Sequence, residues 1–178
     1  LFVVGFIVAT ALVYFSMAFA FRHRPSSSRG EASAALRGYQ EALEPVRRAA
    51  FWGVALFFGF TNGARLATEH LLAQGLTDVV HISGPAGWSD AQMRRRGYEQ
   101  ACQAYDIEPV VLQPDSWDSR DGYDVMRAVG RLPQGIQTAN DQLALGAMRY
   151  IYESGGVVPR DVRVVGFDDI DGADSYAP

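Results

Sequence analysis

Short apolar runs alternate with helix-like stretches through the C-terminal half of the chain. Each run is rich in β-branched residues or leucine, and a polar or glycine-containing corner follows it. Strands that alternate with helices pair in parallel, so the alternation predicts an α/β fold, a parallel four-stranded sheet flanked by helices on both faces. The strands are expected over residues 79–83, 110–112, 136–138 and 162–165, the last three as neighbours in the sheet.

A helix is expected over residues 63–75, before the first strand. Asn62 has a side chain suited to an N-cap, and Gly75 is a typical helix stop. The apolar face of this helix is expected to hold Leu66, Leu71 and Leu72.

Three further helices are expected over residues 89–105, about 119–131 and 141–154. Ser89 and Gln92 have the spacing of a capping box at the start of the first of these.

Three consecutive arginines, Arg94, Arg95 and Arg96, follow one turn into the helix at 89–105. Consecutive helix positions point about 100° apart, so the three cannot serve one ligand together. Arg94 shares a side with Gly97 and Tyr98, and the other two arginines are expected to face solvent.

Polar and aromatic side chains gather where the predicted strands end. Asn140 and Asp141 follow the third strand, Asp168 follows the fourth, Trp117 lies in the loop after the second, and Arg94 lies beyond the first. The carboxyl ends of parallel strands meet at one edge of a sheet, so these residues are expected to lie together. Amide, carboxylate and guanidinium groups bind vicinal hydroxyls, and an indole packs on C–H surface. The sequence therefore predicts a site for a small polar ligand such as a sugar.

The same side chains also have purely structural interpretations. Asn140 and Asp141 can cap a helix, and Asp168 with Asp169 can form a turn. Trp117 can anchor its loop. Their shared position at one edge of the sheet is what favours a ligand site.

Charge divides the chain into two parts. Residues 1–62 carry six arginines and three glutamates, a net charge of +3, whereas residues 63–178 carry ten arginines and seventeen acids, a net charge of −7. The acidic part lacks the basic stripe of a nucleic-acid-binding surface.

Motifs for catalysis are missing from the sequence: it has no Gly-x-Ser-x-Gly, phosphate loop, His-Glu-x-x-His or cysteine pair. Asp168 and Asp169 could hold magnesium, but no lysine or third acid accompanies them. The single cysteine, Cys102, is expected to be buried apolar filler, with a reactive thiol as the alternative. The sequence thus indicates a protein that is not an enzyme and has no cofactor or bound metal.

The N-terminal part resembles a membrane segment in composition. Residues 1–21 are uncharged and would span about 30 Å as a helix, the thickness of a bilayer core. A basic flank follows at residues 22–24, which favours a transmembrane helix. A signal peptide and a buried helix of a soluble protein are the alternatives.

A polar linker and a second apolar run follow this segment. The linker is expected over residues 25–30, and a helix broken by Pro45 comes after it. The second apolar run, residues 49–61, is a short apolar helix too short to span a bilayer. The arginines of the intervening loop favour the cytoplasm for that loop, and therefore also for residues 63–178.

Several motifs of residues 63–178 match one family. They are Gly63-Ala64-Arg65, Ala67-Thr68-Glu69-His70-Leu71, His81-Ile82-Ser83-Gly84-Pro85, Arg94 with Gly97-Tyr98, the run 139–148 and a motif within residues 157–169. On these motifs the region resembles the effector-binding domain of the LacI/GalR family of bacterial sugar-responsive repressors. The resemblance implies one lobe of a periplasmic-binding-protein-like fold that senses a sugar-like effector and catalyses nothing.

The resemblance also implies roles for residues and partners. Arg94 corresponds to the arginine that grips the effector, Trp117 to an aromatic wall, and Asn140 and Asp168 to groups that bind hydroxyls. In this family the domain forms homodimers, and DNA is bound through a helix-turn-helix headpiece that this sequence lacks. The opposing lobe of the effector site is also absent from this sequence, so weak or no sugar binding is expected.

Residues 1–61 resemble part of an uncharacterised family of bacterial multi-pass membrane proteins. The likeness rests on the apolar run that ends at residues 20–25 and on the segment over residues 39–48, before the next apolar run. Two functional alternatives therefore stay open: a membrane-anchored chimeric or misassembled fragment without a working sensor, and an extracytoplasmic sugar-binding receptor.

Overall fold

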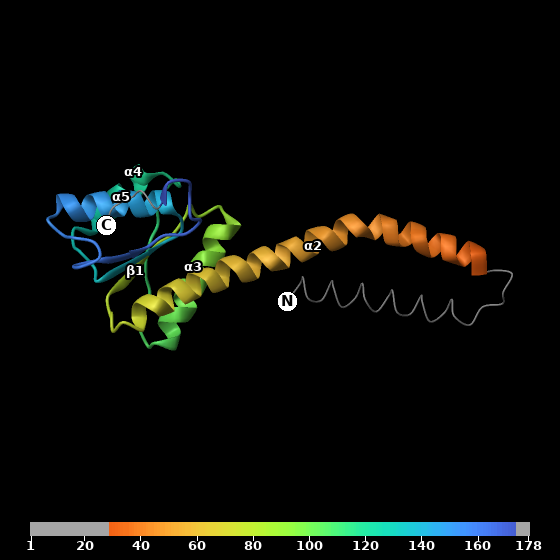
Figure 1. Cartoon of the computed structure of the whole chain (residues 1–178), viewed down its shortest axis with the longest axis horizontal. Coiled ribbons are helices and arrows are strands. Elements are labelled where there is room, and N and C mark those ends of the chain that lie inside the picture. Colours follow the sequence, from red (N-terminus) through yellow and green to blue (C-terminus); the bar gives the residue numbers. More distant parts are fainter. Residues whose placement is uncertain (1–28, 174–178) are drawn as a thin grey trace. The chain divides into compact units, whose positions relative to one another are not determined.

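The computed structural model describes residues 29–173, and the chain divides into two compact units, Leu1–Ala55 and Leu56–Pro178. The second unit alternates strands and helices (Figure 1), which confirms the predicted α/β fold. The elements are α2 (Arg29–Leu72), β1 (Val79–Ile82), α3 (Ser89–Ala104), β2 (Val110–Leu112), α4 (Ser119–Val129), β3 (Gly135–Thr138), α5 (Asp141–Glu153) and β4 (Arg163–Val165).

The sheet is parallel and four-stranded, with the order β2-β1-β3-β4. The expected adjacency of β2 and β3 is wrong, because β1 lies between them. Every residue of β1 and β3 is buried, whereas β2 and β4 are partly exposed. A central strand is flanked by strands on both sides and covered by helices on both faces. The most buried strands, β1 and β3, therefore lie at the centre of the sheet.

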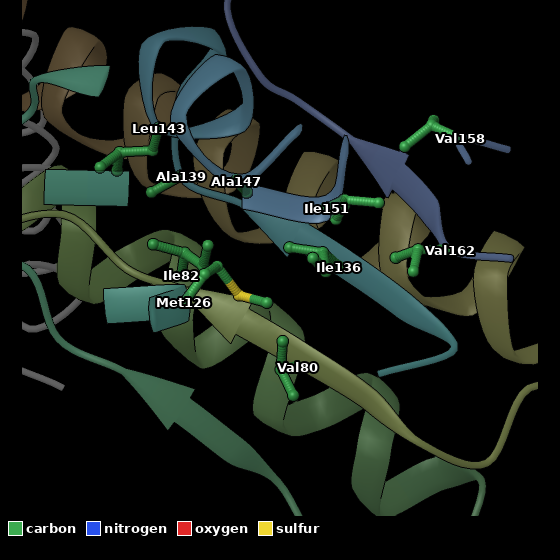
Figure 2. Packing of buried hydrophobic residues seen from close by; sticks show 10 residues of the cluster. All are labelled: Val80, Ile82, Met126, Ile136, Ala139, Leu143, Ala147, Ile151, Val158 and Val162. Atoms are coloured by element: carbon green, nitrogen blue, oxygen red, sulfur yellow. The ribbon is translucent and has the colours of Figure 1, made fainter. Parts of the chain in front are cut away.

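Alternate strand residues supply two separate apolar layers. Val80, Ile82 and Ile136 point to the face covered by α4 and α5, where they pack with the other buried residues shown in Figure 2. Val79 points to the opposite face and packs with residues of α2 and α3, including Tyr98. The period of two in the strands therefore places helices on both faces, as predicted.

The helix boundary expected at Asn62-Gly63 is wrong, and Pro45 does not break the helix before it. One helix, α2, runs through all three positions. Asn62 does not cap a new helix; its Nδ2 donates to Phe58 O, one turn back, at 2.9 Å. The short apolar helix predicted over 49–61 is accordingly an internal part of α2.

The buried face of the end of α2 also differs from the expected one. Leu71 and Leu72 are buried, as predicted, but Leu66 is 57% exposed. Ala64 and Thr68 take its place in the interior, because Thr68 lies one turn and Ala64 two turns before Leu71 on the same side of the helix. Gly75 adopts a left-handed φ of 84° just past the helix, as expected of a stop.

The capping box predicted at Ser89 and Gln92 does not form. Trp88 is the N-cap of α3, and no side chain caps the helix there. Gln92 instead donates from Nε2 to the carbonyl of Ala86 at 3.1 Å, across the turn that precedes the helix.

Within residues 29–173, no helix has an apolar stretch long enough to cross a bilayer. The transmembrane helix predicted over residues 1–21 lies outside the described residues.

Candidate functional site

The candidate site lies at the carboxyl edge of the sheet. The helices that follow β1 and β2 cover opposite faces of the sheet. From β1 the chain adds β2 on one side and then β3 and β4 on the other, so the direction of strand addition switches between β1 and β3. Such a switch point leaves a crevice at the carboxyl ends of parallel strands, where ligands of open α/β sheets bind. The four predicted site residues come from the segments that surround this point.

Arg94 is the centre of the site. It points inward from α3 and is only 4% exposed, whereas Arg95 and Arg96 face solvent, as predicted. Its Nη2 donates to Asp168 Oδ1 at 2.9 Å, and Nη1 lies 3.7 Å from Asp90 Oδ2. Burial lowers the pKa of the guanidinium, and the two carboxylates oppose that shift. An arginine remains charged at such a site, so the protein holds a buried positive charge at this edge.

Three aromatic rings surround the Arg94 guanidinium. Its Cζ lies 4.3 Å from the Phe167 ring centroid, 4.5 Å from that of Phe60, and 5.8 Å from that of Trp117. Cation–π attraction compensates part of the cost of taking the charge out of water. The Nε atom is buried and has no hydrogen-bond partner among the described residues.

Asp168 follows β4 and pairs with Arg94 from a strained backbone. Its φ is 102° and that of Asp169 is 53°, positive values that non-glycine residues seldom adopt. Burial raises the pKa of Asp168, while the nearby Arg94 lowers it and the carboxylates of Asp141 and Asp90 raise it further. Such strain is typical of functional loops and is maintained by the surrounding contacts.

Trp117 is fixed against the strand end beside it. A Cβ atom added to Gly84 would overlap the Trp117 indole, so only glycine allows this approach. Trp88 packs edge-on against Trp117 with 5.9 Å between ring centroids. The indole therefore forms a rigid wall of the site, in agreement with its predicted placement.

Asn140 is the N-cap of α5, and the interpretation of Asp141 as the cap is wrong. Asn140 Oδ1 accepts from Leu143 N at 2.8 Å, and its Nδ2 donates to Trp117 O at 3.2 Å. Asp141 Oδ2 instead accepts from Ile170 N at 3.0 Å and holds the loop that carries Asp168. Asn140 thus joins α5 to the Trp117 loop, and its structural and ligand-binding roles are compatible because each of its polar atoms retains further bonding capacity.

The structure brings all four predicted residues together: Arg94 contacts Asp168 and Trp117, and Asn140 holds the Trp117 loop. The sequence interpretation missed Phe60. That residue stands in an apolar run that resembles a membrane segment, and no local pattern indicates that α2 reaches the site. The one indirect signal is Gly97, on the same side of its helix as Arg94, since a glycine inside a helix can admit a neighbouring backbone; here Gly97 packs on the Thr61 backbone.

A hollow of about 590 Å³ lies elsewhere, between the outer sides of α4 and α5. Its lining includes Tyr123 and Leu145 but none of the four candidate residues. We assign the site to the residues around Arg94 because they converge at the carboxyl ends of the parallel strands, whereas the hollow is lined only by residues of α4 and α5. Within residues 29–173, no three His, Cys, Asp or Glu side chains form a set that could hold a metal ion.

Residues 68–178 match the family model of the periplasmic binding protein-like domain. The chain belongs to this domain family. The match covers the sheet and the site and begins within α2, so the likeness of residues 1–61 to membrane proteins stays a prediction.

Bacterial repressors are among the similar proteins. The chain is 35% identical over 127 residues to the lactose operon repressor of Escherichia coli, covering 70% of this chain and 35% of that protein. It is 36% identical over 111 residues to the ribose operon repressor of Halalkalibacterium halodurans, covering 61% of this chain and 33% of that protein. The chain thus spans about a third of the length of these relatives.

Solved structures of LacI-type regulators share the fold. A dimeric Lac repressor aligns with a TM-score of 0.63 at 34% identity, over 67% of this chain and 45% of that one. A LacI-family regulator from Enterococcus faecium with bound ribose aligns with a TM-score of 0.61 at 25% identity, over 67% of this chain and 46% of that one. The periplasmic binding protein-like unit of the chain is therefore related to the sensing domain of transcriptional repressors.

Proposed function

We propose that residues 63–178 form one lobe of the effector-sensing domain of a LacI-type transcriptional regulator, and that its effector is a sugar-like polyol. The supporting observation is the Arg94–Asp168 pair at the carboxyl edge of the sheet, with aromatic rings beside it. Guanidinium and carboxylate groups bind neighbouring hydroxyls, and the indole of Trp117 packs on the C–H face of a sugar ring. Relatives named for the lactose and ribose operons agree with this chemistry.

The proposed action is a shift between conformations and not a reaction. An effector that binds Arg94 and Asp168 more tightly in one arrangement of the regulator increases the population of that arrangement. DNA would be contacted through a headpiece outside this sequence, and the sensing region would act as a homodimer in the cytoplasm. No cofactor or metal takes part in this proposal.

Calorimetric titration of the chain with ribose and other pentoses and hexoses tests the function. We expect saturable heat with a Kd in about the millimolar range, because a single lobe provides one wall of the site. Asp168→Asn removes the charge but keeps the shape of the side chain. It should weaken binding at least about tenfold, since a hydrogen bond to a charged group contributes about 1.5–3 kcal/mol.

Asp169→Asn is the matched control, because it removes a neighbouring exposed carboxylate from the same loop. This variant should bind like the unchanged chain. Asn140→Ala should both weaken binding and lower stability, because the residue also caps α5. A folded chain that gives no saturable heat with any of these sugars would refute a working sugar sensor.

A further inference from the structure

Arg94 is enclosed too completely for a ligand to reach its hydrogen-bonding atoms. Its exposed fraction is 4%, Asp168 occupies Nη2, and Asp90 lies near Nη1. The proposed effector requires at least one of these donors. A wall of the enclosure must therefore move before an effector binds.

The distances show which sides of the guanidinium the two phenylalanines cover. Cζ lies 4.5 Å from the Phe60 centroid and 4.3 Å from that of Phe167, and the two centroids are 6.1 Å apart. These three lengths form nearly a right-angled triangle with Cζ at the right angle. The rings therefore cover adjacent sides of the cation and do not sandwich it, so displacement of one ring opens a continuous approach.

Two of the three aromatic walls are held in place. Trp117 packs closely on Gly84, and Asn140 binds its backbone carbonyl. Phe167 lies against Gly63, in a loop that Asp141 fixes through Ile170 N. Movement of either wall would disrupt these contacts.

Phe60 is the wall that can move. It is half-buried and projects from α2, and its ring has no polar atom, so its rotation breaks no hydrogen bond. A helical phenylalanine has two favourable χ1 rotamers, and a change between them moves the ring by several ångströms.

We propose that Phe60 is a built-in cap on the effector arginine: its ring closes the site over Arg94 in the ligand-free chain, and a polyhydroxyl effector binds after the ring swings away. The inference rests on the proposed function. It adds a residue of α2 that regulates access to the site, and it predicts that removal of the ring increases effector affinity.

Chemical modification of Arg94 tests the cap without any effector. Phenylglyoxal condenses with accessible guanidinium groups, and its rate at each arginine is measured by mass spectrometry after digestion with a protease that does not cut at arginine. Arg96, exposed on the same helix, is the internal reference. In the full unchanged chain, Arg94 should react at least about tenfold more slowly than Arg96, corresponding to about 1.4 kcal/mol.

Phe60→Ala should increase the modification rate of Arg94 about tenfold, and Phe60→Leu should give an intermediate rate. Phe58→Ala is the matched control, because it removes an aromatic ring that is 59% exposed from the same helix and should leave Arg94 protected. Equal protection of Arg94 in the Phe60 variants and the unchanged chain would overturn the cap.

Labelling of Cys102 separates uncapping from unfolding. This thiol is fully buried, so it should react slowly with a maleimide in any folded variant. If Phe60→Ala makes Cys102 reactive, that variant is partly unfolded. The reactivities of Arg94 and Cys102 are then compared in the milder variant Phe60→Leu, where Arg94 should become reactive while Cys102 stays protected.

Ribose titration of the same variants distinguishes the two proposals. Tighter binding to Phe60→Ala than to the unchanged chain supports both the cap and the sugar site. Exposure of Arg94 without binding of any sugar would refute the sugar effector and leave the cap. Equal ribose affinity with unchanged Arg94 reactivity would refute the cap and leave the sugar site.

Discussion

At the scale of single residues, the least expected group is a buried histidine. His81 is completely buried and stacks on Tyr98 with 5.1 Å between ring centroids. Its Nδ1 lies 3.1 Å from Gln137 O, an acceptor, so Nδ1 carries the proton of the neutral ring. Burial lowers the pKa of His81 to about 4; hydrogen bonds to Gln137 oppose this shift, and Arg95 and Arg94 add to it.

His81 therefore makes stability depend on pH. Its folded-state pKa is below that of the unfolded chain, so the contribution is fully present above pH 6.5 and is lost as the pH falls towards 4. A shift from 6.5 to about 4 corresponds to a loss of about 3 kcal/mol in the free energy of unfolding. Urea unfolding in buffers of about pH 7.5 and about pH 4.5 measures this loss in the free energy of unfolding.

His81→Leu should show a smaller loss over the same range, because the variant has nothing to protonate at this position. His70→Leu, an exposed position on α2, is the control and should keep the full loss. Parallel stability curves for the unchanged chain and His81→Leu would contradict the prediction.

At the scale of elements, glycines allow α4 and α5 to touch. A Cβ atom on Gly122 would overlap the Leu143 backbone, and one on Gly146 would overlap the backbone of Ser119 and Tyr123. Both positions lie inside helices, where glycine is otherwise unfavourable. Their presence is explained by close approach of the two backbones, which places the Trp117 loop beside Asn140.

Gly146→Ala should lower the free energy of unfolding by about 1–3 kcal/mol, since the helices must separate to admit the methyl group. Gly87→Ala is the control, because a Cβ there meets no atom within 4 Å, and its effect should stay within about 0.5 kcal/mol. Thermal and urea unfolding measure both. Equal stability of the two variants would show that the backbones are less closely packed than described.

At the scale of the whole molecule, self-association is expected. The α2 helix exposes Phe58 and Leu66 at 59% and 57% on neighbouring sides of the helix, apolar surface that a second copy would cover. Light scattering should therefore give about twice the chain mass of 19.5 kDa, decreasing on dilution. A mass of one chain at every concentration would refute the homodimer.

Local sequence patterns are enough to predict the α/β class, the existence of each strand, and the four residues around the candidate site. These features follow from local patterns: periods of two and 3.6, and polar corners at the ends of apolar runs. Even the inward orientation of Arg94 follows from its spacing to Gly97 and Tyr98 on one helix.

The strand order, the continuity of α2 and the enclosure of Arg94 depend instead on tertiary packing. Arg94 and Asp168 are 74 positions apart, and Asn140 reaches the Trp117 loop across 23 positions. Contacts at such separations depend on how whole elements pack, which no local period encodes. The Phe60 ring illustrates the difference: its sequence context resembles a membrane segment, and only the packing of α2 on α3 through Gly97 places it over Arg94.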